Sequence, residues 1–458
     1  MPNRTLLITI LSVLFTTFAL AAKVSAQGIP PYPNAITDRL IHLETPMAPP
    51  LRNVVFTDPD FGSSMVRATD ATTNFKLPGT FMETESSGKA NEWSADTSKF
   101  YVVGKGGQNL AFAFDPATMA ISSLPGAQQG QGLLVPLRAG ATFSFTDPDL
   151  IYGTHDPDTL IINSYRFSTG VTTPVIDTTT CGTQPPLVSG PKVVSDDDVS
   201  LSLDDTRLAI SEGGPQSGKD MFVVVYDKSM GCRWYNTQTG QIGGQWGTTG
   251  AATVTTPYLI RHAYLSHSGN YVVILVNWFG WYVWDLSTLN VTACPVHSNV
   301  DECAGYDAIG YDSFINGPAT TGDMQVVKRP MNNISQISQL VWPVSYDWGQ
   351  EQQFSWSNVD VNDSAPVCGS MHSYDGDTSI DQPFAAEIFC IETDGVASTI
   401  WRFAHNRATY VFPYFQTQPL GSVSRDGRFL LFTSDWDSQL GTGVDGTPLS
   451  DAFIVKLD

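Results

Sequence analysis

Ser424-Arg425-Asp426-Gly427, followed by the run Phe429-Leu430-Leu431-Phe432, is the stretch of sequence that decides the fold. A serine and turn-forming residues stand directly before a strand of bulky apolar residues. Aspartate and glycine supply the backbone angles that a tight hairpin turn needs. The stretch therefore predicts a turn leading into a buried strand.

This arrangement recurs four times earlier in the chain, as Ser94-Ala95-Asp96, Thr146-Asp147-Pro148-Asp149, Ser202-Leu203-Asp204-Asp205 and Ser266-His267-Ser268-Gly269. The intervals between successive copies are 52, 56, 64 and 158 residues. The last interval equals about three of the others, so we expect two degenerate copies between residues 305 and 395. A period of this size is typical of one four-stranded propeller blade, whose first and second strands meet at the repeated turn.

A second feature follows each of three of these turns. A strand ends there in an aromatic or apolar residue and an aspartate, at Phe114-Asp115, Tyr226-Asp227 and Trp284-Asp285. We interpret this pair as the end of the third strand of a blade. The sequence thus predicts an all-β, seven-bladed propeller of four-stranded antiparallel blades, with five blades seen and two inferred.

Segments at the two ends of the chain also have the composition of strands but lie outside the five blades. They are residues 53–56 and 64–67 near the N-terminus and residues 452–457 at the C-terminus. A ring of blades leaves open edges unless strands from the two termini complete one blade, so we expect these segments to share a closing sheet. A β-sandwich followed by a smaller domain fits the length but not the regular spacing.

The N-terminus has the features of a signal peptide. Arg4 precedes an apolar run over residues 6–22, and Val24-Ser25-Ala26 offers small residues for cleavage after Ala26. An uncleaved membrane anchor is the alternative, because the run is nearly long enough to span a bilayer. We expect a signal peptide over residues 1–26, a Pro-rich segment over residues 27–50 that wraps the outside, and one propeller domain over residues 51–458. The mature protein is then extracellular or periplasmic, without a membrane span.

Charge excludes one class of partner. The whole chain carries 24 basic and 45 acidic residues, and the first 26 residues remove Arg4 and Lys23 and no acid, which leaves a formal charge of −23. Nucleic acid binding depends on clustered lysine and arginine, and no such cluster occurs. We therefore expect the partner to be a glycan or an extracellular protein rather than a nucleic acid. We also expect the protein to be a monomer.

The chain has six cysteines, an even number that predicts disulfides in an oxidising compartment. Their order favours three pairs, although fifteen pairings are possible: Cys181 with Cys232, Cys294 with Cys303, and Cys368 with Cys390. The chain has no C-x-x-C motif, so its cysteines give no indication of a zinc site.

The last copy of the repeat, continued through Thr433-Ser434-Asp435-Trp436, resembles the blade motif of TolB-like and WD-like bacterial propellers. The stretch Asp58-Pro59-Asp60-Phe61-Gly62 resembles the opening strand of secreted propellers, among them relatives of oligogalacturonate lyases. That second resemblance implies a metal held by histidine and glutamine near the central funnel. Here Gln416 and Gln418 precede the last motif, where the lyase family has a histidine.

Residues for chemistry are expected where the inner strands and their loops converge on the central channel. A histidine with a tyrosine and an arginine can perform β-elimination on a uronic acid, because arginine neutralises the carboxylate while histidine or tyrosine removes the C5 proton. The candidates for these catalytic roles are His262, His372, His405, Arg407 and Tyr410. Fastening of strands by a hydrogen bond is the alternative role for His262.

Further candidates concern ligand and metal binding. The expected ligand-binding residues are Asp198, Tyr414, Gln416, Gln418, Trp278 and Trp281. The tryptophans also suit core packing between blades. Asp375, Asp377 and Asp381 offer closely spaced oxygens for calcium or another divalent cation, although the composition favours a solvated loop over a metal site there and no cofactor is required.

Two functions remain open on the sequence alone. The first is a propeller that binds an extracellular glycan or protein at its funnel face. The second is a polysaccharide lyase that acts on a glycan containing uronic acid. No G-x-S-x-G elbow and no phosphate-binding loop occurs, so serine hydrolase and nucleotide chemistry lack support.

Overall fold

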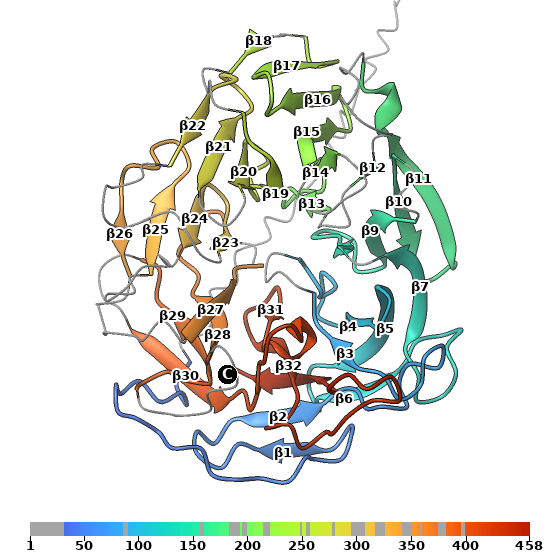
Figure 1. Cartoon of the computed structure of the whole chain (residues 1–458), viewed down its shortest axis with the longest axis vertical. Coiled ribbons are helices and arrows are strands. Elements are labelled where there is room, and N and C mark those ends of the chain that lie inside the picture. The colour runs from blue at the N-terminus through green and yellow to red at the C-terminus, as the bar shows by residue number, and fades with distance from the viewer. Residues whose placement is uncertain are drawn as a thin grey trace, which may run out of the picture.

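Seven small antiparallel sheets form a ring around a common axis in the computed structural model (Figure 1). The structure describes residues 32–458 except 86–89, 139, 156–159, 183–192, 195–198, 214–219, 248–249, 253–256, 277–279, 295–306, 317–325, 341–349, 358–359, 374–381 and 395–398. Helix within this part is confined to two short 3-10 turns, η1 (Thr178–Thr180) and η2 (Phe415–Thr417). The predicted seven-bladed β-propeller is confirmed.

The first four blades run in chain order. Blade 1 contains β3 (Met82–Glu83), β4 (Lys99–Gly104), β5 (Gln108–Asp115), β6 (Ala120–Ser123) and β7 (Leu133–Arg138). Blade 2 contains β8 (Thr142–Phe143), β9 (Leu150–Thr154), β10 (Ile161–Arg166) and β11 (Val171–Asp177). Blade 3 contains β12 (Val193–Val194), β13 (Ser200–Leu201), β14 (Arg207–Gly213), β15 (Asp220–Asp227), β16 (Gly231–Asn236), β17 (Gln241–Gly244) and β18 (Gly250–Ala251). Blade 4 contains β19 (Ile260–Leu265), β20 (Tyr271–Val276), β21 (Trp281–Asp285) and β22 (Val291–Ala293).

The last three blades complete the ring. Blade 5 contains β23 (Asp307–Ile309), β24 (Ser313–Asn316), β25 (Val327–Pro330) and β26 (Ser338–Gln339). Blade 6 contains β27 (Gln350–Ser355), β28 (Val367–Ser373), β29 (Glu387–Ile391) and β30 (Ile400–His405). Blade 7 contains β31 (Gly421–Val423), β32 (Phe429–Ser434), β33 (Asp451–Lys456), β2 (Ser64–Arg67) and β1 (Val55–Thr57). The two degenerate repeats are therefore blades 5 and 6.

Closure of the ring depends on strands from both ends of the chain. The N-terminal strand β2 pairs antiparallel with the C-terminal strand β33, so that Met65 faces Val455 and Arg67 faces Phe453. Arg67 Nη2 also lies 2.5 Å from the carboxylate of Asp451 at this seam. The expected closing sheet is confirmed, and β1 extends it by one outer strand.

The repeated serine fixes the turn between the first two strands of a blade. Its hydroxyl oxygen accepts the backbone N–H of the residue five positions later, at 2.9–3.1 Å, at Ser94, Ser202, Ser266 and Ser424. The fourth residue of the turn has a positive φ, which is 73° at Gly269 and 71° at Gly427. Glycine suits this position because it lacks the Cβ that makes the left-handed region unfavourable.

The hydrophobic core is divided among the junctions between blades. Seven clusters of buried side chains occur among the described residues, and each joins two neighbouring blades. Strand β32 shows how: Phe429 and Leu431 pack toward blade 1, whereas Leu430 and Phe432 pack toward blade 6. Both faces of such a strand are covered, which explains why the strand is apolar throughout rather than alternating.

Two disulfides lie within the described residues. Cys181–Cys232 links the end of blade 2 to β16 of blade 3, and Cys368–Cys390 joins β28 to β29 within blade 6. Both pairs match the prediction and fit an oxidising compartment. The pairing of Cys294 with Cys303 stays a prediction because Cys303 lies outside the described residues.

The expected signal peptide also lies outside the described residues, so its cleavage stays a prediction. Across the part of the chain that is described, no helix has the length and apolar character needed to cross a bilayer.

Candidate functional site

The connection from blade 6 to blade 7 carries most of the predicted site residues. It spans residues 406–420, leaves β30 and enters β31, and we refer to it as the aromatic loop. Its central part is a tight coil, in which the N–H of Tyr414 donates to the carbonyl of Val411 at 2.8 Å and the turn η2 follows. The peptide between Phe412 and Pro413 is cis.

Two aromatic rings of this loop are exposed to solvent. Phe412 is 56% exposed and Phe415 is 48% exposed, and their ring centroids are 5.8 Å apart in an edge-to-face arrangement. Phe415 also contacts the buried ring of Tyr410, at 5.8 Å. Exposed, contiguous aromatic surface on a soluble protein is typical of a binding site.

His372 lies beside this aromatic group. It is near the end of β28, is buried, and meets Tyr410 edge-to-face with 5.6 Å between ring centroids. Burial lowers the pKa of His372 to about 3, because the charged imidazolium loses its hydration there. The imidazole is therefore neutral at physiological pH and presents no positive charge to a ligand.

Amide side chains adjoin the same junction of blades 6 and 7. The Nε2 atoms of Gln416 and Gln353 are enclosed and have no hydrogen-bond partner among the described residues. Gln353 lies opposite Ser370 in the β27–β28 pair, and Ser370 Oγ donates to the carbonyl of Pro419 at the end of the aromatic loop. An enclosed amide without a partner costs about 1–3 kcal/mol, so each of these donors would gain from a polar partner. Gln418 is buried at the end of η2, and Tyr414, also predicted, precedes η2.

His405 and Arg407 occupy a different environment, under the N-terminal segment at the outer edge of blade 6. Both side chains are fully buried. His405 Nδ1 lies 3.2 Å from Asp60 Oδ2, and its Nε2 lies 3.0 Å from the carbonyl of His42. Arg407 Nη1 lies 2.7 Å from Glu44 Oε1. These groups are therefore engaged by the N-terminal segment.

Asp58, Asp60 and His405 form a donor set of the kind that a divalent cation takes, with one ligand atom from each within 4.8 Å of the others. Their atoms already bind protein groups: Asp60 accepts from Thr45 Oγ1 at 2.6 Å, and Asp58 accepts from the N–H of Phe61 at 2.9 Å. Arg407 Nη2 also lies 4.0 Å from Asp60 and supplies positive charge there. The described contacts thus account for these carboxylates without an ion.

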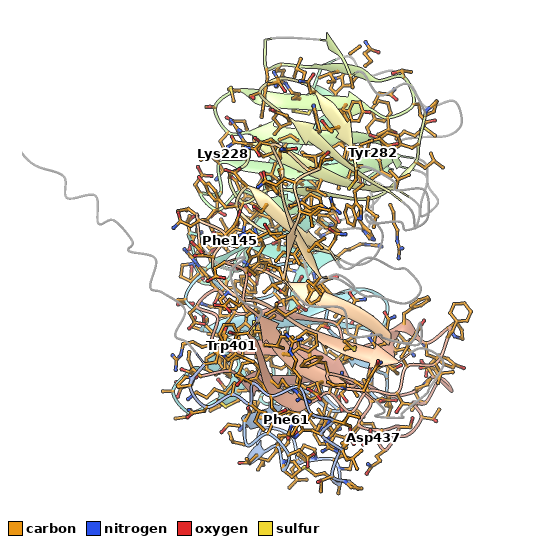
Figure 2. The ribbon with its side chains drawn as sticks, turned by 90° about the vertical axis from the view of Figure 1, so that its left-hand side faces the viewer. Phe61, Phe145, Lys228, Tyr282, Trp401 and Asp437 are labelled. Atoms are coloured by element: carbon orange, nitrogen blue, oxygen red, sulfur yellow. A yellow bond between two sulfur atoms is a disulfide. The ribbon has the colours of Figure 1, made fainter. Side chains whose placement is uncertain are left out.

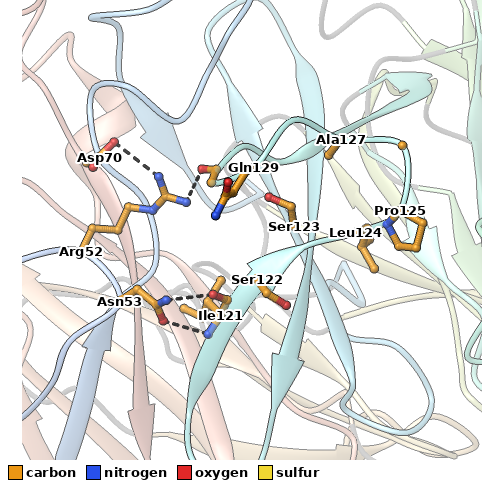
Figure 3. A pocket seen from close by; sticks show the side chains of 12 residues that line it. Arg52, Asn53, Asp70, Ile121, Ser122, Ser123, Leu124, Pro125, Ala127 and Gln129 are labelled. Atoms are coloured by element: carbon orange, nitrogen blue, oxygen red, sulfur yellow. Dashed lines mark hydrogen bonds and ion pairs between the residues drawn. The ribbon is translucent and has the colours of Figure 1, made fainter.

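A groove of about 810 Å³ lies on the outer side of blade 1 (Figure 3). Its polar side chains join the N-terminal segment to the blade: Asn53 Nδ2 donates to the carbonyl of Ile121 at 2.9 Å, and Arg52 Nη1 lies 3.8 Å from Asp70 Oδ1. The far wall is the loop over residues 124–132, which interrupts the outer strand between β6 and β7. None of the predicted site residues lines this groove.

The remaining predicted residues are dispersed. His262 lies on β19 of blade 4, where it stacks on Tyr264 with 5.7 Å between ring centroids. Trp281 is buried and packs against Phe314, so it fills the core between blades 4 and 5. The other predicted ligand-binding and calcium-binding residues lie outside the described residues: Asp198, Trp278, Asp375, Asp377 and Asp381. From the predicted set, the structure thus brings His372 into contact with Tyr410, and Tyr414, Gln416 and Gln418 lie on the same loop as Tyr410.

Comparison with known proteins gives a fold and no family. No protein-family model matches the sequence, and no curated protein sequence matches it at a significant level. A solved oligogalacturonate lyase in complex with manganese aligns with a TM-score of 0.55 and 13% identity, over 91% of this chain and 99% of the other. The chain shares its propeller fold. An oligogalacturonate lyase from Vibrio parahaemolyticus aligns with a TM-score of 0.54 and 11% identity, over 88% of this chain and 96% of the other.

The predicted distant relation to such propellers is therefore confirmed at the level of the fold. Identities this low carry no residue roles from one chain to the other. The sequence analysis missed Phe412 and Phe415, which are the exposed members of the site. The signal that was available is an aromatic-rich coil broken by Pro413, directly before a blade motif, since a buried strand would not contain that proline.

Proposed function

We propose that the protein is a secreted glycan-binding propeller that stacks a neutral sugar chain on Phe412 and Phe415. The observation that carries this proposal is the exposed aromatic pair, with Gln416 next to Phe415 in the same loop. Aromatic rings bind the apolar faces of sugars, while amides hydrogen-bond to their hydroxyl groups. Secretion is supported by the two disulfides and by the predicted signal peptide.

Charge favours a neutral glycan over a uronic acid polymer. Arg407 is the only lysine or arginine in the aromatic loop, and its guanidinium group binds Glu44 and the carbonyl of Thr45. His372 is neutral, for the reason given above. A carboxylate on the ligand would therefore meet no cation from this loop, and the chain as a whole carries a formal charge of −21.

The test is binding of the purified protein to a panel of soluble neutral and uronate-containing oligosaccharides, measured by calorimetry. We expect at least one neutral oligosaccharide to bind, and the F412A/F415A double variant to lose about tenfold or more in affinity, because two stacking contacts of roughly 1 kcal/mol each disappear. Val171→Ala is the control, since Val171 is 54% exposed but lies on the outer strand of blade 2. The proposal fails if no neutral glycan binds, or if the double variant binds as the unmodified protein does.

The lyase hypothesis from the sequence needs arginine, histidine and tyrosine around one substrate. Among the described residues, Tyr410 faces His372, whereas Arg407 and His405 are engaged by the N-terminal segment. We therefore expect no unsaturated uronate, which absorbs near 235 nm, from any uronate in the panel, with or without added manganese or calcium. Appearance of that absorbance would restore the lyase hypothesis.

A further inference from the structure

The described part of the N-terminal segment that precedes β1 lies against blades 6 and 7. We call residues 32–50 the strap. It is anchored to β30 by backbone hydrogen bonds in both directions between Ile36 and Arg402, at 3.3 and 2.9 Å. Figure 2 shows Phe61, which follows the strap, and Asp437 of blade 7 at the same end of the molecule.

Arg407 is the point where the strap reaches the aromatic loop. Its Nη1 atom lies 2.7 Å from Glu44 Oε1, and its Nη2 atom donates to the carbonyl of Thr45 at 2.9 Å. The guanidinium group also stacks on the ring of Trp436 at 5.2 Å, and Trp436 Nε1 donates to the carbonyl of Met47 at 2.9 Å. Strap residues thus hold both the cation and the ring beneath it.

The backbone at Arg407 is held in an unfavourable conformation. Its φ is +51°, in the left-handed region that side chains other than glycine rarely adopt. The carbonyl of Arg407 accepts from Ser434 Oγ at 2.7 Å and from the N–H of Asp437 at 2.8 Å. Such a conformation persists only while the surrounding contacts fix it.

We infer that Glu44 is a positioning residue for the ligand-binding loop: through Arg407 it fixes the direction in which the aromatic loop leaves β30. The inference rests on the proposed function for its affinity readout. Beyond Arg407 the loop presents Phe412 and Phe415 with large exposed fractions, so few packing contacts of their own hold those rings in place. Their position therefore depends on the base of the loop. Burial raises the pKa of Glu44 to about 8, and above that pH its carboxylate is the one closest to the Arg407 guanidinium group, ahead of Asp437 at 3.7 Å and Asp60 at 4.0 Å. Removing the Glu44 charge there weakens the pairing of a buried cation, and such a group moves toward water.

The strap provides a matched control. Asp38 also forms an ion pair with a buried arginine, at 2.9 Å from Arg402 Nη1, but Arg402 lies within β30 and keeps the carboxylate of Glu387. Loss of the Asp38 charge therefore perturbs the strap without releasing the aromatic loop. The comparison of Glu44→Gln with Asp38→Asn separates loop positioning from general loosening of the strap.

The experiment has two readouts on the secreted protein, both taken at about pH 9, where Glu44 is ionised because its pKa is raised only to about 8. The first is limited chymotrypsin digestion, followed by mass spectrometry of cleavage after Tyr414 or Phe415. The second is calorimetric affinity for the neutral oligosaccharide that binds best in the panel. For E44Q we expect cleavage about tenfold faster and affinity about tenfold weaker, because the loop samples open conformations more often. For D38N we expect both values to equal those of the unmodified protein.

The outcomes distinguish the two proposals. Unchanged cleavage in E44Q, or equal changes in E44Q and D38N, overturns the positioning role of Glu44, even when the unmodified protein binds a glycan. Faster cleavage in E44Q alone, in a protein that binds no glycan, supports the positioning role and rejects the proposed function.

Discussion

Buried arginines in this protein hold structure together, and Arg402 is the clearest case. Its guanidinium group donates to both carboxylate oxygens of Glu387, at 2.5 and 2.7 Å. The side chains of Arg402 and Glu387 are both fully buried. Removing one member of such a pair leaves an uncompensated charge in a poorly polarisable environment. An arginine on the surface has no such consequence, because water screens it.

Arg402→Ala is therefore expected to lower the free energy of unfolding by about 3–5 kcal/mol. Arg166→Ala is the comparison, since Arg166 also contacts two carboxylates, at 2.9 and 3.3 Å, but with 43% of its side chain exposed. We expect the unfolding midpoint in urea to fall for the first variant and to stay unchanged for the second. Equal shifts in the two variants would contradict this account of the buried pair.

At the level of residues, the sequence proposed candidates but not their arrangement. Of the catalytic candidates late in the chain, His372 contacts Tyr410, whereas His405 and Arg407 are engaged by the N-terminal segment. The environment of Arg407 was not predictable, because its partner Glu44 lies 363 residues earlier in the chain. No local pattern connects an irregular strap to a strand end so distant in sequence.

At the scale of elements, the repeated serine turn is the feature from which the propeller fold was predicted. Five blades carry it, and in blade 2 the serine that accepts the turn N–H is Ser144, from Asp147 at 2.8 Å. The motif could not be found in blades 5 and 6 because their turns are built differently. In blade 5 the turn follows Gly310, whose N–H donates to the carbonyl of Ser313, and no serine is needed. In blade 6 a longer connection over residues 356–366 replaces the turn.

The closing strand gives a prediction for this scale. Strand β2 is hydrogen-bonded on both sides, by β1 and β33, whereas β1 has a strand on one side only. In hydrogen exchange followed by mass spectrometry, we expect β2 amides to exchange as slowly as those of β33, because opening them requires opening the ring. The amides of β1 serve as the internal control and should exchange faster. Exchange of β2 at the rate of β1 would show that the N-terminal strand does not close the propeller.

At the scale of the whole molecule, the excess of acid sets the pH dependence of stability. Burial raises the pKa of Glu83 to about 8 and that of Asp435 to about 7. In the unfolded chain both groups titrate near pH 4, so between about pH 4 and 8 the folded protein binds protons that the unfolded chain releases. Stability from these groups is therefore present at acidic pH and is lost as the pH rises through this window. Mutual repulsion within a chain of formal charge −21 acts in the same direction.

We expect the melting temperature to be higher at about pH 6.5 than at about pH 8 when ionic strength is constant. The buried imidazoles of His372 and His267, whose pKa values burial lowers to about 3 and about 4, oppose the acids only below about pH 6.5. The Glu83→Gln variant should reduce this difference, because glutamine has no proton to lose. Below about pH 4 the turn aspartates act in the opposite sense: hydrogen bonds from Ser229 and Arg207 help to lower the pKa of Asp227 to about 2, against the effect of its burial, and its protonation costs stability. A melting temperature that rises steadily from about pH 6.5 to about pH 8 would contradict this assignment.

The central claim is that a neutral glycan binds on the aromatic loop between blades 6 and 7. Hydrogen exchange of the protein, with and without a saturating amount of the tightest-binding neutral oligosaccharide, tests it most directly. We predict slower exchange within residues 406–420 and at the end of β28, with the rest of the ring unchanged. Slower exchange at the groove over residues 121–130 instead, or no change in the aromatic loop, would contradict the claim.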